Sequence, residues 1–190
     1  MIFLVTNQKE LFESEVYFII DIDKCLSLLW NMPMIQVDTE TNGRDAHINK
    51  VLCIQFGNDI LDCQIVVDTT TISLNIFKEV LESKYLILQN AKFDLQFLYN
   101  FNIHPTKVYD IMIVEQFLYL GYPSGLTISE EEYKQEGYNF PYHKNINEET
   151  GKVTYTLSFA LDAIASKRLN IYINKEIRSQ IIWRGLDTDV

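Results

Sequence analysis

The sequence predicts a single α/β domain, in which a mixed sheet (an antiparallel meander plus parallel strands) is flanked by helices. Short apolar strands open the chain, strands then alternate with helices, and no second apolar block follows. The length of 190 residues suits one good core and is short for two domains. With 47% hydrophobic and 22% charged residues, the chain has the composition of an ordinary globular protein.

The first half of the chain is expected to supply most of the strands. Helical spacing follows the second strand over residues 23–30, and Pro33 ends this helix. The turn Gly57-Asn58-Asp59 joins two apolar, partly alternating segments and predicts the antiparallel meander. The predicted strands cover residues 2–6, 16–20, 34–38, 51–57 and 60–68.

The rest of the chain is expected to alternate helices with short strands and to carry an insertion. Residues 121–155 contain turn residues, a charge run (SEEEYKQEG) and an Asn-rich piece (HKNINEETGK), which indicate an insertion or hairpin rather than a core element. Asp110 is expected to cap the helix that follows it. Predicted helices cover residues 74–81, 92–99, 111–120 and 157–169, with strands at 85–88 and near Val108.

Composition excludes several classes of protein. No apolar run is long enough to span a bilayer, and the first residues do not resemble a secretory signal. Cys25, Cys53 and Cys63 are odd in number and lack C-x-x-C spacing, which favours buried free thiols and a cytoplasmic protein. The net charge of −10 argues against coating long nucleic acid, but it is compatible with an enzyme that grips a few nucleotides through bound cations.

Two acidic positions raise the question of function. In VDTETNGRD, Asp38 and Glu40 alternate along a strand, so they point to the same side, where like charges repel. In NAKFDLQFL, Asn90 ends a strand and Asp94 falls in the first turn of a helix. Taken separately, these segments fit a turn and a helix-start acid. Taken together, they supply carboxylates of the kind that hold Mg²⁺.

The order of D-x-E and then N-x-x-F-D resembles the DEDD family of 3′–5′ exonucleases, whose fold is ribonuclease H-like. The chain is most similar to the exonuclease domain attached to family A, DNA polymerase I-like, DNA polymerases. The segment LSFALDAIASKRLNIYINKEIRSQIIWRGLDTDV resembles the part of these domains, and of ribonuclease D-like enzymes, that leads into a third motif. The resemblance covers nearly the whole chain.

The resemblance implies hydrolysis of phosphodiester bonds by two divalent ions, Mg²⁺ or Mn²⁺. Asp38 would bridge both ions, Glu40 would bind the ion on the nucleophile side, and Asp94 would support the other ion. Thr41 would contact the terminal nucleotide and Asn90 would order the site.

Two further residues complete the substrate-binding set that the resemblance implies. Phe93 is the aromatic residue of the second motif. Arg44 stands near the place of an aliphatic wedge in many relatives, and its guanidinium can stack on a base.

A third motif, an Asp preceded by Tyr or His, is expected beyond Val190, so the resemblance predicts a C-terminally incomplete and impaired domain. Asp187 and Asp189 are interpreted as helix-start acids. His143 and Glu148 have the spacing of the histidine-type third motif, but they fall in a Pro/Asn-rich segment, and His143 is expected to be an exposed loop residue.

Three functions are compatible with these motifs. The first is proofreading by an exonuclease domain of a DNA polymerase, which acts in DNA replication and takes a single-stranded 3′ end as its partner. The second is ribonuclease D-like trimming of RNA 3′ ends, although DNA is the more expected of the two substrates. The third is a non-catalytic module that binds 3′ ends, and the intact acids Asp38, Glu40 and Asp94 argue against it. No membrane partner is expected.

Overall fold

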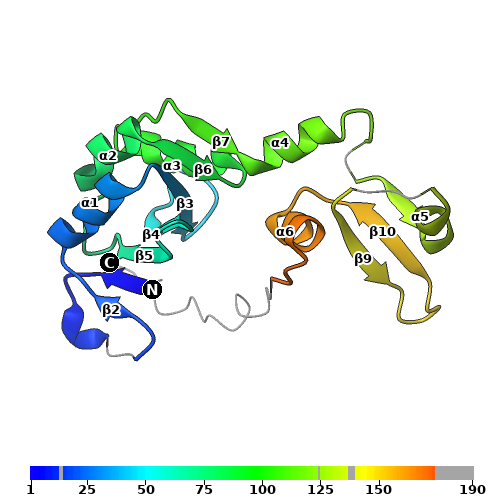
Figure 1. Ribbon diagram of the computed structural model, residues 1–190, viewed down its shortest axis with the longest axis horizontal. Helices are drawn as coiled ribbons and strands as arrows, with labels where there is room; N and C mark the ends of the chain where they lie inside the picture. The colour runs from blue at the N-terminus through cyan, green and yellow to red at the C-terminus, as the bar shows by residue number, and fades with distance from the viewer. Residues whose placement is uncertain (13–14, 124, 137–139, 174–190) are drawn as a thin grey trace. The chain divides into compact units, whose positions relative to one another are not determined.

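The computed structural model describes residues 1–12, 15–123, 125–136 and 140–173 (Figure 1). The chain divides into two compact units, Met1–Ile111 and Met112–Val190. Each unit is built around its own cluster of buried apolar side chains. The described residues contain no helix that is both long and apolar enough to cross a membrane.

The first unit contains a seven-stranded sheet with the strand order β2-β1-β5-β4-β3-β6-β7. Strands β3, β4 and β5 form an antiparallel meander, and all other neighbouring strands pair in parallel. This arrangement confirms the predicted mixed sheet. The strands are β1 (Ile2–Val5), β2 (Phe18–Ile19), β3 (Met34–Thr41), β4 (Val51–Asn58), β5 (Cys63–Asp68), β6 (Tyr85–Leu88) and β7 (Val108–Asp110).

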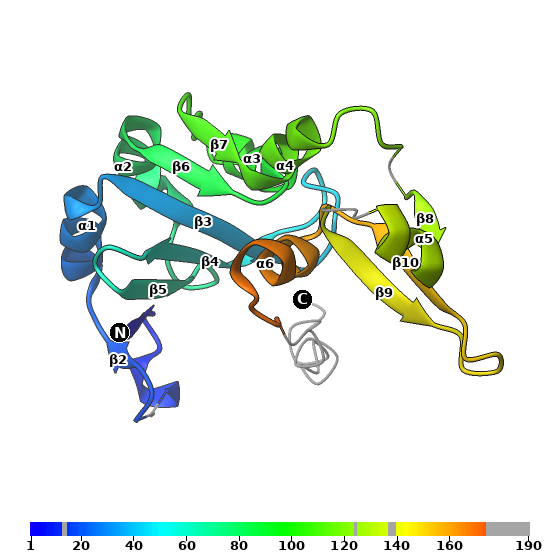
Figure 2. The same cartoon turned by 45° about the vertical axis from the view of Figure 1, so that its right-hand side comes forward.

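Helices of the first unit connect these strands (Figures 1 and 2). The Asp21 side chain accepts a hydrogen bond of 2.8 Å from the Lys24 N–H and so caps α1. Along β3, Ile35, Val37 and Thr39 are buried, whereas the residues that alternate with them are more exposed. The helices are η1 (Lys9–Leu11), α1 (Ile22–Asn31), η2 (Leu74–Phe77), α2 (Lys78–Ser83) and α3 (Ala91–Asn100).

The second unit pairs a small antiparallel sheet with helices. Its strand order is β8-β10-β9, and Phe140 and Tyr155 lie in its core. The ring of Tyr133, from α5, stacks on that of Tyr155 at 4.2 Å between centroids. The elements are α4 (Ile111–Leu118), whose first residue belongs to the first unit, β8 (Thr127–Ser129), α5 (Glu130–Glu136), β9 (Tyr142–Ile146), β10 (Val153–Leu157) and α6 (Leu161–Leu169).

Two predictions for this region are wrong. The helix expected from residue 157 begins at Leu161, because Leu157 ends β10, where its side chain is buried and its N–H donates to the Leu126 carbonyl. His143 is not a loop residue, since it lies on β9 and its Nε2 is 3.1 Å from Oδ2 of Asp162. The β9–β10 pairing gives the segment a hairpin. That residues 121–155 are an insertion in a single domain stays a prediction.

Other expectations differ in detail. The strands predicted at 16–20 and 60–68 are shorter, because only Phe18–Ile19 and Cys63–Asp68 pair in the sheet. Cys25 and Cys63 are buried and Cys53 is half-buried, and all three are free thiols, as predicted. Asp187 and Asp189 lie outside the described residues.

Candidate active site

The segments that carry the three predicted acids end or begin at one edge of the large sheet. Strands β3 and β6 are parallel neighbours, so their carboxyl ends lie at the same edge. Asp38 and Glu40 are close to the end of β3, and Asp94 is in the first turn of α3, which follows β6. The pairing of β3 with β6 therefore brings together two acidic segments that lie more than fifty residues apart in the sequence.

Thr39, between the two acids of β3, contacts the third acid directly. Its backbone N–H and its hydroxyl donate hydrogen bonds of 2.9 and 2.6 Å to the same oxygen, Oδ1 of Asp94. Thr39 is 5% exposed and Asp94 is 3% exposed, so this contact is shielded from water. Sequence analysis gave Thr39 no role.

The surroundings of Asp94 favour its neutral form. Burial raises the pKa of the Asp94 carboxyl, the hydrogen bonds from Thr39 lower it, and the negative charge of Asp38 raises it again. The balance places the pKa at about 6. A cation near Asp38 and Asp94 would relieve their repulsion.

Glu40 shares its sheet face with a thiol on the neighbouring strand. Cys53 on β4 lies directly opposite Glu40 in the strand register. Burial first, and then the charges of Glu40 and Asp38, raise the pKa of the Cys53 thiol to about 11. The negative charges of both β3 acids therefore act on this half-buried thiol, which the sequence pattern did not connect with them.

The start of α3 is fixed by Asp110. Asn90, the residue before the helix, has a left-handed backbone with φ of 60°. The two carboxylate oxygens of the buried Asp110 accept hydrogen bonds from the N–H groups of Asn90 at 3.1 Å and Ala91 at 2.8 Å. Asp110, expected to cap the helix after it, thus binds the start of the helix that carries Asp94.

The remaining predicted residues lie around this edge. The Thr41 hydroxyl donates to the Gly43 carbonyl at 2.6 Å, just beyond a register shift between Glu40 and Thr41. Arg44 is exposed in the loop that follows β3. Phe93 is half-buried, with its ring 5.3 Å from that of Phe97 and packed against the core.

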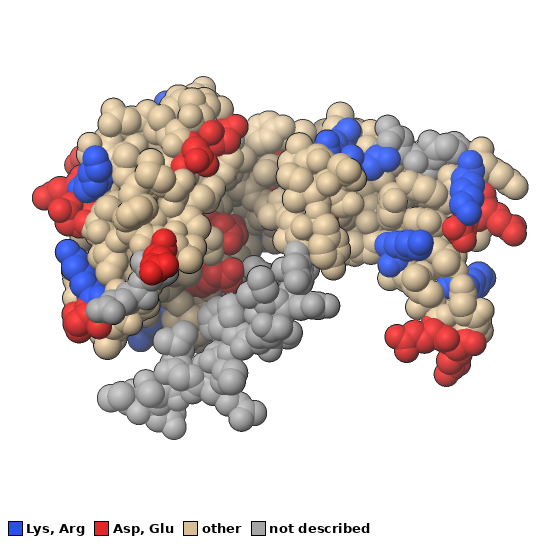
Figure 3. Space-filling view, turned by 60° about the horizontal axis from the view of Figure 1, so that its bottom comes forward, with Lys and Arg blue, Asp and Glu red and all other residues tan. Residues whose placement is uncertain are grey.

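The donor set has the chemistry of a site for hard cations, because carboxylate oxygens are the ligands that Mg²⁺ prefers. Within the described part of the chain, no three Asp, Glu, His or Cys side chains are grouped closely enough to hold a metal ion as they stand. The closeness of Asp38 to Asp94, which raises the Asp94 pKa, nevertheless fits a shared cation. On the face shown in Figure 3, the drawn Lys and Arg side chains are scattered and form no broad basic surface.

Comparison with known proteins places these residues in context. A family model described as 3′–5′ exonuclease matches residues 19–180. DNA polymerase I of Aquifex aeolicus is 28% identical over 96 residues, which cover 50% of this chain and 16% of that protein. The chain therefore spans about a sixth of the length of this relative.

Solved structures share the fold. The catalytic core of RRP6 from Trypanosoma brucei aligns with 97% of this chain and 38% of its own length, at a TM-score of 0.59 and 13% identity. The Aedes aegypti Nibbler EXO domain aligns with 93% of this chain and 72% of its own length, at a TM-score of 0.55 and 14% identity. Brucella melitensis NrnC with bound Mg²⁺ aligns with 92% of this chain and 64% of its own length, at a TM-score of 0.50 and 15% identity.

Proposed function

The chain belongs to the 3′–5′ exonuclease family, and from that premise we propose that it hydrolyses phosphodiester bonds at the 3′ ends of single-stranded nucleic acid. Its ribonuclease H-like fold brings the D-x-E strand next to the helix that bears Asp94. The contact of Thr39 with Asp94 carries the proposal, since it joins the two acidic motifs at one sheet edge.

Asp38, Glu40 and Asp94 are the residues that would hold two divalent ions, Mg²⁺ or Mn²⁺. Bound ions would supply a water of lowered pKa and stabilise the charge on the leaving oxygen. Mg²⁺ is bound in the NrnC structure, whose fold this chain shares. Without a cation, the charges of Asp38 and Glu40 would repel the phosphates of a nucleic acid.

The other residues of the edge position the acids and the substrate. Thr39 holds one oxygen of Asp94 and leaves the other for a cation. Asp110 fixes the start of α3 through Asn90, so that Asp94 is held in place along the helix. We assign Thr41, Arg44 and Phe93, which surround the acids, to contact with the terminal nucleotides.

DNA is the proposed substrate, and proofreading within a longer DNA polymerase is the proposed role. The similarity to DNA polymerase I, 28% over half of this chain, supports this choice. RNA trimming, as in ribonuclease D-like enzymes, uses the same acids and remains the alternative. The two substrates differ at the 2′-hydroxyl, which local contacts distinguish.

Calorimetric titration with Mn²⁺ tests the metal site. We expect Asp38→Ala to weaken binding most, because Asp38 is the proposed bridge, and Glu40→Ala and Asp94→Ala to weaken one ion more than the other. Asp23→Ala, an exposed acid in the first turn of α1, is the matched control. Binding by Asp38→Ala with the affinity of the unaltered chain would refute the assignment.

Degradation of 5′-labelled single strands tests the reaction. We expect products shortened from the 3′ end only when Mg²⁺ or Mn²⁺ is present, with DNA cut faster than a matched RNA, and none with Asp38→Ala. Faster cutting of RNA would support the ribonuclease D-like alternative. Metal-independent binding of 3′ ends without any cutting would indicate the non-catalytic module.

A further inference from the structure

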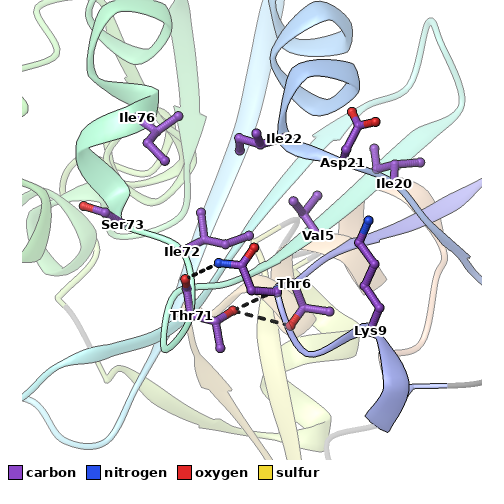
Figure 4. A pocket seen from close by; sticks show the side chains of 11 residues that line it. Val5, Thr6, Lys9, Ile20, Asp21, Ile22, Thr71, Ile72, Ser73 and Ile76 are labelled. Atoms are coloured by element: carbon purple, nitrogen blue, oxygen red, sulfur yellow. Dashed lines mark hydrogen bonds between the residues drawn. The ribbon is translucent and has the colours of Figure 1, made fainter.

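A pocket of about 220 Å³ lies beyond the carboxyl ends of β1 and β5, at the same sheet edge as the acids but two or more strands away from β3. Its walls come from the residues after β1, from the start of α1 and from the residues after β5 (Figure 4). In the sheet, β4 separates β5 from β3, which bears Asp38 and Glu40. The pocket is therefore distinct from the candidate metal site.

Five of the eleven residues that line the pocket have aliphatic side chains. Ile72 and Val5 are buried at its base, whereas Ile76 is 46% exposed. Ile20 and Ile22 add a further wall at the start of α1. Among the described residues that line the pocket, no side chain is aromatic, so it lacks the stacking surface on which nucleobases are usually held.

The other six lining residues are polar. Two of them carry opposite charges, and the uncharged ones are Thr6, Asn7, Thr71 and Ser73. Lys9 and Asp21 lie on one side of the pocket, and Ser73 and Ile76 lie on the other (Figure 4). The Lys9 ammonium makes no ion pair with any described residue. Asp21 uses Oδ1 to cap α1 by accepting from the Lys24 N–H, so the cap requires only one of its two oxygens.

The volume indicates how large a group the pocket can enclose. Each water molecule occupies about 30 Å³ of the liquid, so a pocket of 220 Å³ corresponds to roughly seven waters and to a ligand of roughly seven to ten non-hydrogen atoms. A nucleoside monophosphate is more than twice this size. The size of the pocket, its aliphatic residues and its two opposite charges together fit a small zwitterion with an apolar tail.

We propose that this pocket binds a free aliphatic α-amino acid of the size of valine, leucine or isoleucine. Its carboxylate pairs with Lys9 and its ammonium with Asp21, which lie on the same side as an α-amino acid requires. Its side chain packs among Ile22, Ile72 and Ile76. This binding is independent of the proposed nuclease activity.

Calorimetry with the full chain and three probes tests the recognition of both charges. Leucine has both charged groups, 4-methylpentanoate lacks the ammonium, and 3-methylbutylamine lacks the carboxylate. We expect leucine to bind at millimolar or lower concentration and about tenfold more tightly than either analogue, because each analogue leaves one charged partner unmatched. Equal affinities for all three probes, or no heat with leucine, would overturn the proposal.

Charge-removing variants identify the two partners. Asp21→Asn keeps a good capping side chain and removes only the charge. It should abolish the preference for leucine over 4-methylpentanoate and keep the preference over 3-methylbutylamine, whereas Lys9→Gln should do the reverse. Asp23→Asn and Lys24→Gln, which change exposed residues of the same helix outside the lining, are the matched controls.

Two further outcomes bear on the ligand class. Ile76→Phe, at the exposed side of the wall, should weaken leucine binding and leave the circular dichroism of the chain unchanged. Tighter binding of a nucleoside monophosphate than of leucine, lost in Lys9→Gln, would replace the amino acid by a nucleotide and refute the assignment. Controls that reduce leucine binding as strongly as Lys9→Gln would also refute it.

Discussion

Thr39 donates both its backbone N–H and its hydroxyl to a single oxygen of Asp94. The two residues are 55 positions apart in sequence, and both are almost completely buried. The contact ties the end of β3 to the first turn of α3. Because the carboxyl of Asp94 is shielded from water, each of these hydrogen bonds contributes to the stability of the site as well as to its geometry.

Replacing Thr39 by Val should therefore destabilise the first unit. The hydroxyl bond is lost and the buried carboxyl keeps only the backbone N–H, which we expect to lower the free energy of unfolding by about 1–3 kcal/mol. Thr39→Ser retains a hydroxyl and should retain most of this stability. Urea denaturation in the presence of EDTA measures the free energy of unfolding of both variants. A Val variant as stable as the Ser variant would contradict the role of the hydroxyl.

The carboxyl of Asp94 should make stability depend on pH when no metal is bound. Burial, with a further contribution from the charge of Asp38, raises its pKa from the ordinary 3.8 to about 6, so the folded chain holds the proton more tightly than the unfolded chain. Stability from this group is complete below about pH 4 and is lost as the pH rises to about 6, by at most about 3 kcal/mol.

Asp94→Asn removes this loss, because the amide carries no charge and its oxygen can still accept from Thr39. Without metal, the variant should be more stable than the unaltered chain at pH 7.5 and should lose that advantage near pH 4. Added Mn²⁺ should stabilise only the unaltered chain appreciably. Parallel pH profiles for the two proteins would show that Asp94 titrates normally.

Local patterns drew attention to the acids, but not to the residues that hold them. Asp38 and Glu40 were noted from strand alternation and Asp94 from its place after an apolar strand. Their joint assignment to a metal site came from the family resemblance and stays a prediction. Thr39 was missed because a Thr in a strand has no local signal for a partner 55 residues away. The hydrogen bonds of Asp110 to the start of α3 depend on β6 and β7 being neighbours, which no short segment specifies.

The sheet was predicted more accurately than the second unit. Alternation and the predicted turn Gly57-Asn58-Asp59 indicated the meander, since a one-residue slip would reverse its faces. In the structure Gly57 and Asn58 still pair in β4 and the turn follows them. Residues 121–155 carry few aliphatic residues, so their core of tyrosines and Phe140 was not recognised. Leu157 was assigned to a helix because its spacing with Leu161 matches one turn, although β10 buries it.

Phe140 should test whether this second core is separate. It is 1% exposed and its ring lies 5.8 Å from Tyr122 and 6.4 Å from Tyr133. Phe140→Ala should cost about 3–5 kcal/mol within the second unit. Hydrogen exchange should then speed up in β10 and remain unchanged in β3. Phe77→Ala, in the core of the first unit, should give the reverse pattern, and faster exchange in both units for either variant would contradict separate cores.

Arg168 and Glu115 join α6 to α4 through a two-point ion pair. The Arg168 guanidinium donates from Nε to Oε1 at 2.8 Å and from Nη2 to Oε2 at 3.0 Å, and Glu115 is the buried residue of α4. Arg168→Ala leaves that carboxylate without its two donors and should cost about 2 kcal/mol, a value reduced because Arg168 is partly exposed. Arg168→Lys keeps the positive charge but loses the two-point geometry of the guanidinium, and it should lower the free energy of unfolding less than Arg168→Ala does.

The exposed pair of Lys134 with Glu130, 2.9 Å apart on α5, provides the control. Lys134→Ala removes an ion pair between a Lys and a Glu from a solvated surface and should leave the stability almost unchanged. Hydrogen exchange of the amides in residues 161–169 should speed up strongly in Arg168→Ala and hardly at all in Lys134→Ala. Equal effects of the two substitutions would mean that burial of Glu115 adds nothing to the pair, and that α6 is held on α4 by its apolar contacts alone.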